Sequence, residues 1–136
     1  MAKVRGIDHI GIAVKNSAAT REIFENLFGL KFSGEEVVES QGVKVMFCDL
    51  GGTKLELVEP TREDAAIAKY IEKRGEGIHH ICFDVEGIEG MIADIKSKGG
   101  EVTNDPPRAG AHGRVVTFVP PKSASGVLVE LSEKKK

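Results

Sequence analysis

The stretch GIHHICFDV (residues 77–85) decides the fold, because the chain carries a second version of it near its start. IDHIGIAV (7–14) and IHHICFDV (78–85) both place a histidine third, among apolar and small residues. Both have the composition of β-strands, in which neighbouring side chains point to opposite faces. A sequence that repeats at this distance predicts two similar halves.

The similarity continues beyond the two strands. A helix-like segment follows each one and ends at glycine: residues 17–29, with Ile23, Phe24, Leu27 and Phe28 as the predicted apolar face, and residues 88–100, with Ile88, Met91, Ile92 and Ile95. Strand-like runs come next, QGVKVMFCDL (41–50) against HGRVVTFVPP (112–121) and TKLELVE (53–59) against VLVELSE (127–133). Each half is therefore predicted to have the order β-α-β-β-β.

Residues 61–75 separate the halves and predict a linking helix at about 62–74. Thr61 and Asp64 suit a variant of the capping box at its start, and Ala65, Ala68 and Ile71 share one face. We predict an α+β fold and a single domain, residues 1–136. It consists of two modules, at about 5–60 and 76–133, since neither is long enough to bury a good core alone.

The amino-acid composition of the chain disfavours several classes of partner. The 136 residues carry 19 Lys and Arg against 21 Asp and Glu, a net charge of −2, which gives no electrostatic case for nucleic acid or a membrane surface. The chain contains no apolar run long enough to span a bilayer and no signal-like start. Cys48 and Cys82 lack metal-type spacing, so we expect buried, reduced thiols. Because no targeting segment is found, we expect a cytoplasmic protein.

Side-chain alternation separates the two adjacent histidines of 77–85. In the first strand, His9 lies with Gly11 and Ala13, while Asp8 lies with the large apolar residues that should pack against helices. In the repeated strand, His80 falls on the face that matches His9. His79 falls on the packing face. His9 and His80 are therefore the predicted cleft residues.

Two glutamates repeat in the same way. Glu56 and Glu130 each point away from an apolar pair in the last strand of their module, 74 residues apart, while His9 and His80 are 71 apart. A single strand glutamate is ordinarily solvated, but the duplicated pattern brings two imidazoles and two carboxylates to matching faces. Such a set suits a divalent ion such as Co, Mn, Zn or Ni, with coordination positions left open.

The duplicated His…Glu pattern resembles the glyoxalase, or vicinal oxygen chelate, superfamily. IDHIGIAV, KLELVEP, GIHHICFDV, GAHGRVVTF and PKSASGVLVEL together are similar to the methylmalonyl-CoA epimerase family over roughly residues 5–132. The resemblance implies a mixed sheet curled around a metal cleft, with metal ligands at His9, Glu56, His80 and Glu130. It also implies an isomerase of the racemase/epimerase class, an acyl-CoA substrate and a homodimer.

The implied reaction interconverts (2R)- and (2S)-methylmalonyl-CoA through an enolate stabilised by a metal. We assign Glu130 as one proton-transfer group and leave its partner open among Lys44, Glu56 and a bound water. The chain departs from the family pattern at two places. Pro120-Pro121-Lys122 stands where relatives commonly have His-Pro-Lys, and Val43-Lys44-Val45 lacks the carboxylate that some relatives are thought to use.

Two alternatives remain open. A glyoxalase I type isomerase would use a similar His/Glu site on a glutathione adduct. A non-catalytic small-molecule binding protein of the same fold would need no metal ligands. The loop PPRAGAHGRV (106–115), with His112, suits either a ligand-contacting loop or a plain turn.

Overall fold

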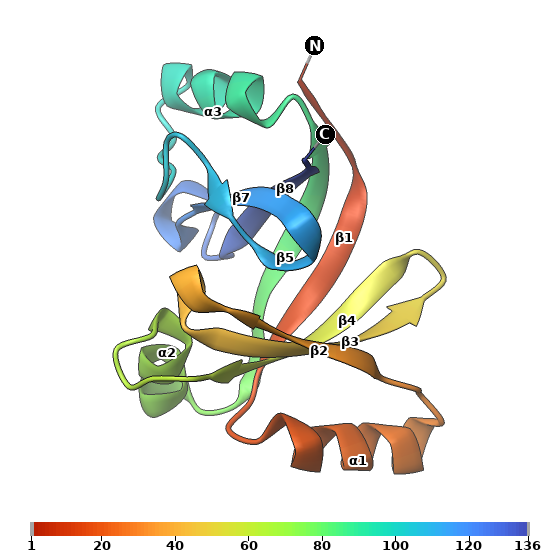
Figure 1. Cartoon of the computed structure of the whole chain (residues 1–136). Helices are drawn as coiled ribbons and strands as arrows, with labels where there is room; N and C mark the ends of the chain where they lie inside the picture. The colour runs from red at the N-terminus through yellow and green to blue at the C-terminus, as the bar shows by residue number, and fades with distance from the viewer. Residues whose placement is uncertain (1, 136) are drawn as a thin grey trace. The chain divides into compact units, whose positions relative to one another are not determined.

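A computed structural model describes residues 2–135 (Figure 1). Within this range, helices α1 (Ser17–Phe28), α2 (Ala66–Arg74) and α3 (Ile88–Ser97) alternate with strands β1 (Lys3–Ala13), β2 (Ser33–Val38), β3 (Val43–Leu50), β4 (Thr53–Pro60), β5 (Gly77–Glu86), β6 (Arg108–Ala109), β7 (Arg114–Val119) and β8 (Val129–Lys134). The predicted tandem β-α-β-β-β order and the α+β class are confirmed. No helix in the described range is long and apolar enough to cross a membrane.

Residue contacts divide the chain into two compact units. One contains the residues up to His9 and those from His80 onward, and the other is Ile10–His79. The division falls within β1 and within β5, so each of these strands contributes to both units. Each unit has its own helix-covered apolar core. The arrangement of both modules as one domain stays a prediction.

In the unit Ile10–His79, the sheet has the order β2-β3-β4-β1. Strands β3 and β4 are antiparallel and place Met46 opposite Leu57 and Phe47 opposite Glu56. Met46 and Leu57 belong to the core beneath α1, to which Phe24 contributes. Because strand side chains alternate, Glu56 lies on the face opposite this core, as predicted.

The predicted apolar face of α1 is wrong in three of its four members. Ile23, Leu27 and Phe28 are 53%, 70% and 64% exposed, and only Phe24 packs against the core. The Phe24 ring lies against Phe32 at a centroid distance of 6.4 Å. Helical spacing brings Phe28 near Phe24, with a ring centroid distance of 5.5 Å, but Phe28 does not pack against the core.

The predicted capping box of the linking helix is also wrong. Helix α2 begins at Ala66, after Ala65, and has no side-chain cap. Asp64 accepts a hydrogen bond of 2.8 Å from Nε of Arg62, whose Nη1 also donates to the carbonyl of Glu39. Asp64 is thus bonded to this arginine and caps no helix N–H group, and the helix starts four residues later than predicted.

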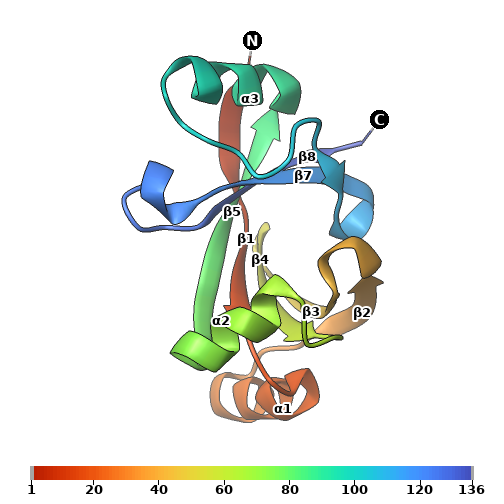
Figure 2. The same cartoon turned by 90° about the vertical axis from the view of Figure 1, so that its left-hand side faces the viewer.

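In the other unit, the sheet order is β1-β5-β8-β7-β6. Strands β5 and β8 are parallel with Cys82 beside Glu130, and β7 runs antiparallel to β8. Helix α3 covers one face through a core that includes Val85, Val119 and Leu131 (Figure 2). Cys82 and Glu130, one residue out of phase with this core, therefore lie on the opposite face.

A matched pair of glutamates ties each module's last strand to its first helix. Glu59 of β4 accepts hydrogen bonds from the backbone and hydroxyl of Ser17, at 2.7 and 2.9 Å, where α1 begins. Glu133 of β8 accepts from the backbone N–H groups of Gly87 and Ile88, at 2.8 and 2.9 Å, where α3 begins. Free N–H groups and the helix dipole favour a carboxylate at this place.

We predict that Glu133→Ala lowers the free energy of unfolding by about 1–2 kcal/mol, because two amide donors at the start of α3 lose their acceptor. Chemical denaturation followed by circular dichroism measures the change. The control is Glu89→Ala, which removes an exposed carboxylate from the first turn of the same helix and should stay within about 0.5 kcal/mol. Equal losses in both variants would contradict a specific capping role.

Candidate metal centre

Three of the four predicted ligands gather in the unit that contains His9 and His80. The parallel register of β5 and β8 places Cys82 beside Glu130, so His80 and Glu130 rise from the same face of neighbouring strands. Strand β1 is the next strand beyond β5 and supplies His9. All three side chains are buried, with exposed fractions of 5–6%.

The three ligand atoms meet at one point. Nε2 of His9 lies 3.1 Å from Oε1 of Glu130 and 3.1 Å from Nε2 of His80. Nε2 of His80 lies 3.0 Å from the same Oε1. The two imidazole rings meet edge to face, at a centroid distance of 5.2 Å. Two ring nitrogens and one carboxylate oxygen thus form a small triangle with nearly equal edges.

This triangle fits a divalent cation. Neighbouring ligand atoms at about 2.1 Å from an octahedral ion lie about 3.0 Å apart, which agrees with the three observed edges. Imidazole nitrogen and carboxylate oxygen are the donors that transition-metal ions of this class accept. Facing nitrogen lone pairs repel each other unless a proton or a cation lies between them, and one cation would satisfy all three atoms together.

The electrostatics of Glu130 agree with a ligand role. Burial by itself would raise the pKa of this carboxyl, but hydrogen bonds from His80 and His9, with their charges, outweigh burial and hold the pKa at about 2. Glu130 is therefore a carboxylate at neutral pH. Its negative charge is available to a cation without the loss of a proton.

Glu56 lies in β4, in the unit Ile10–His79, and is 3% exposed. It stands on the face of that sheet that the parity argument predicted, opposite Phe47 in the register and away from the core under α1. Its membership of the ligand set stays a prediction.

The structure also locates the residues that the sequence left open. His79 packs its ring edge to face on Tyr70 of α2, at a centroid distance of 4.7 Å, which agrees with its predicted packing role. Lys44 lies near Glu35 and Glu59, at 3.7 and 3.8 Å. It therefore belongs to the face of β3 opposite Glu56, which disfavours it as a proton-transfer group beside that glutamate.

The loop 106–115 contains regular backbone structure, and whether it contacts a ligand stays a prediction. It contains β6, paired with β7, and a short helical turn, Ala111–Gly113. His112 occupies the centre of this turn with a φ of 59° and is partly buried. The predicted buried state of both cysteines is confirmed.

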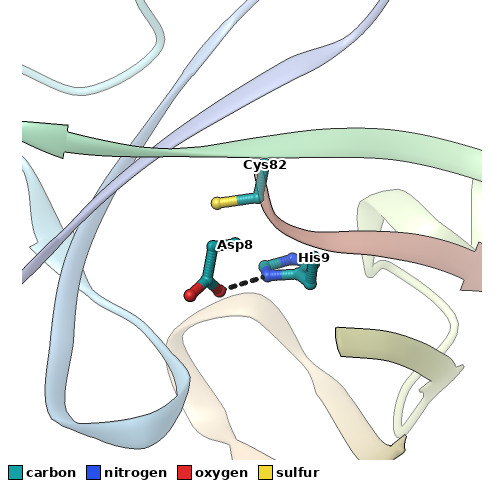
Figure 3. A group of neighbouring side chains, drawn as sticks. All are labelled: Asp8, His9 and Cys82. Atoms are coloured by element: carbon teal, nitrogen blue, oxygen red, sulfur yellow. Dashed lines mark hydrogen bonds and ion pairs between the residues drawn. The ribbon is translucent and has the colours of Figure 1, made fainter. Parts of the chain in front are cut away.

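Sequence reasoning missed a second group around His9, drawn in Figure 3. Oδ2 of Asp8 lies 2.8 Å from Nδ1 of His9, and Cys82 brings its sulfur to the same side chains. Parity alone had assigned Asp8 to the packing face. The available signal was an acidic residue directly before a candidate ligand, since histidine ligands commonly donate their second N–H to a carboxylate.

Sequence reasoning also missed a hydrogen-bond network around a largely buried arginine. Arg114 of β7 donates to the carboxylate of Asp84 and to the hydroxyl and carbonyl of Ser132, with only 14% of its side chain exposed. Arg5 adds a second cation at 3.4 Å from the same aspartate. No motif marks this network, because its members come from four strands.

The geometry agrees with comparisons to known proteins. Residues 8–118 match the family profile of the glyoxalase/bleomycin resistance protein/dioxygenase superfamily. This match spans well over half of the chain, and the chain therefore belongs to that superfamily.

Within the superfamily, the relatives include epimerases. The ethylmalonyl-CoA/methylmalonyl-CoA epimerase of Cereibacter sphaeroides is 37% identical over 93% of this chain and 96% of its own length. A variant of Streptomyces coelicolor methylmalonyl-CoA epimerase, in complex with 2-nitronate-propionyl-CoA, is 41% identical with a TM-score of 0.93 over 98% of this chain and all of that one. The Arabidopsis thaliana lactoylglutathione lyase GLX1 is 22% identical and is covered over 43% of its length. The predicted resemblance to the methylmalonyl-CoA epimerases, which are isomerases, is confirmed.

We predict that the adjacent histidines differ in their effect on metal. His80→Ala removes one corner of the triangle and should abolish stoichiometric binding of Co²⁺ or Zn²⁺. His79→Ala removes a ring that packs on Tyr70 and should lower stability while keeping the metal. Elemental analysis after loading and desalting gives the metal content per chain. The reverse result would show that the strand parity is wrong.

We predict that Cys82 is inert in the folded protein. Burial raises the pKa of its thiol to about 12, so the reactive thiolate is scarce at pH 8. In Cys48→Ser, which leaves Cys82 as the sole thiol, a disulfide reagent should label the protein only after guanidinium is added. Rapid labelling of the folded variant would contradict this expectation.

Proposed function

We propose that this chain is a metal-dependent epimerase that interconverts (2R)- and (2S)-methylmalonyl-CoA. The observation that carries the proposal is the buried triangle of His9, His80 and Glu130, in a chain whose relatives include methylmalonyl-CoA epimerases. We assign Glu56 as the fourth ligand, on the strength of the repeat that matches it to Glu130. The proposal also includes a homodimer, which rests on the family resemblance, and a cytoplasmic location.

The reaction requires a proton to leave and return at the carbon between a thioester and a carboxylate. Its removal places negative charge on the thioester oxygen. A divalent cation held by this site would supply positive charge where the negative charge develops. The protein's own groups must take the proton from one face of the carbon and return one on the other.

Glu130 is the proposed group on one side of the carbon. Between two imidazoles it is a weak base, because their hydrogen bonds and charges hold its pKa at about 2 against the effect of burial. Oε1 must leave these hydrogen bonds to accept a proton, and burial then favours the protonated form. Its partner stays open between Glu56 and a bound water, since Lys44 lies on the other face of its sheet from Glu56.

Two sequence departures limit what is carried over from relatives. Pro120 stands where relatives commonly have a histidine, directly before the turn Pro121–Ser123. Val45 is buried in β3, with an apolar side chain at the segment where some relatives have a carboxylate. The proposal therefore requires no histidine at Pro120 and no base on β3.

The main test is exchange of the substrate α-proton. The metal-loaded protein is incubated with (2R)-methylmalonyl-CoA in deuterium oxide, and the α-hydrogen is followed by NMR. Deuterium that enters with inversion, and stops entering when a chelator is added, would support the proposal. No incorporation with any of Co²⁺, Mn²⁺, Zn²⁺ or Ni²⁺ would overturn it.

Assays of the same protein with other substrates distinguish the epimerase from the two alternative functions. A glyoxalase I type isomerase would convert the hemithioacetal of glutathione and methylglyoxal, and the 22% identity to a lactoylglutathione lyase supports a shared fold only. A binding protein would turn over neither compound. Ethylmalonyl-CoA in a third reaction reports whether the acyl pocket accepts one more carbon.

We predict that Glu130→Gln lowers the rate of epimerisation by about 10²–10⁴-fold, the range for loss of a proton-transfer group, while the folded structure is kept. Gln is close to Glu in shape and still accepts through one oxygen. Glu89→Gln, an exposed site on α3, is the matched control and should retain full activity. Normal turnover by Glu130→Gln would remove the assignment.

A further inference from the structure

Asp8 has a carboxylate in a buried place, with only 8% of the residue exposed. Its Oδ2 lies 2.8 Å from Nδ1 of His9, the ring nitrogen that faces away from Glu130 and His80. Figure 3 shows the carboxylate turned toward the ring, with the sulfur of Cys82 from β5 beside both. Burying a charged carboxylate is costly unless strong donors are supplied, and the imidazole N–H is one such donor.

The position of one proton on His9 decides what its other nitrogen can do. A neutral imidazole carries its proton on either Nδ1 or Nε2, and only the nitrogen without it has a lone pair to offer. A carboxylate accepts hydrogen bonds and donates none. Asp8, at 2.8 Å from Nδ1, favours the form with the proton on Nδ1, whereas Oε1 of Glu130, at 3.1 Å from Nε2, favours the form with the proton on Nε2. The contact with Asp8 is the shorter one, so we take the lone pair of Nε2 to be directed at the triangle.

We infer that Asp8 is a positioning residue: it fixes the tautomer and ring orientation of His9, and so sets the affinity of the triangle for a metal ion. The effect on metal affinity rests on the proposed function, which includes the metal. The effect of Asp8 on the tautomer of His9 does not depend on that proposal.

The arrangement has no copy in the second module. The repeat that matches His9 with His80 places His79 at the position of Asp8, and His79 packs on Tyr70 instead. Asp8 thus acts on one histidine of the pair. His79 packs on Tyr70 and is not part of the triangle, so it serves as an internal reference in the same molecule.

The decisive variant is Asp8→Asn. The amide matches the carboxylate in size, but its NH₂ group can donate to Nδ1 and stabilise the opposite tautomer, with the proton on Nε2. Long-range ¹H–¹⁵N NMR of the four histidines reads the tautomer in the metal-free protein at a pH where they are neutral. We expect Nδ1–H at His9 in the parent protein, a shift toward Nε2–H in Asp8→Asn, and an unchanged His79.

Zn²⁺ binding, measured by competition with a chromophoric chelator, gives the second readout. We expect the Kd of Asp8→Asn to rise by about 10–100-fold, the usual effect of losing a carboxylate partner of a histidine ligand. Asp8→Glu restores an acceptor and should recover part of the affinity. Asp84→Asn removes another carboxylate from the same unit, one held by Arg114, and should change the Kd less than twofold.

The outcomes separate this inference from the proposed function. An unchanged His9 tautomer in Asp8→Asn, or a changed tautomer with an unchanged Kd, would overturn the positioning role. Equal weakening by Asp84→Asn would also overturn it, since a general loss of negative charge would then explain the effect. A parent protein that binds Zn²⁺ and shows the tautomer shift, yet fails the deuterium exchange, would keep the role of Asp8 and reject the epimerase.

Discussion

The contact between one carboxylate and two imidazoles is the constraint on which the unit containing His9 and His80 depends. Burial of a charge in a protein interior is unfavourable unless opposite charges or strong donors accompany it. Glu130 is 6% exposed and has Nε2 of His9 and of His80 within 3.1 Å. Burial alone would raise the pKa of Glu130, and the hydrogen bonds and charges of the two imidazoles lower it to about 2. The three strands that supply the residues must therefore keep their register.

This register explains why the site could be predicted from the sequence. In β5 and β8, the apolar residues that pack under α3 determine one face, and alternation places His80 and Glu130 on the other. A slip of one residue in either strand would bury the polar side chains against α3 and expose the core. Strand register thus determines both the apolar face and the positions of the candidate ligands. The sequence repeat presents this pattern in each of the two modules.

The parts that sequence reasoning missed depend on side-chain contacts that alternation does not describe. Asp8 belongs by parity to the face opposite His9, yet its carboxylate bonds the neighbouring ring at 2.8 Å. Periodicity on α1 marked Leu27 and Phe28 as core residues, but both are exposed and only Phe24 of the predicted apolar face packs against the core. Asp64 is a residue type that often caps helices, but its carboxylate is bonded to Arg62 and the helix starts later. Local patterns fail where a side chain has a competing partner.

The repeat preserves scaffolding more strictly than chemistry. Glu59 and Glu133 each accept two hydrogen bonds at the start of a helix, Glu59 from the backbone and hydroxyl of Ser17 and Glu133 from two backbone N–H groups, so each module ties its helix to its last strand through a glutamate. Around the histidines the modules differ, because Asp8 bonds a ring where His79 packs on a helix. The two modules are therefore alike in how they hold their helices and different in what surrounds their histidines.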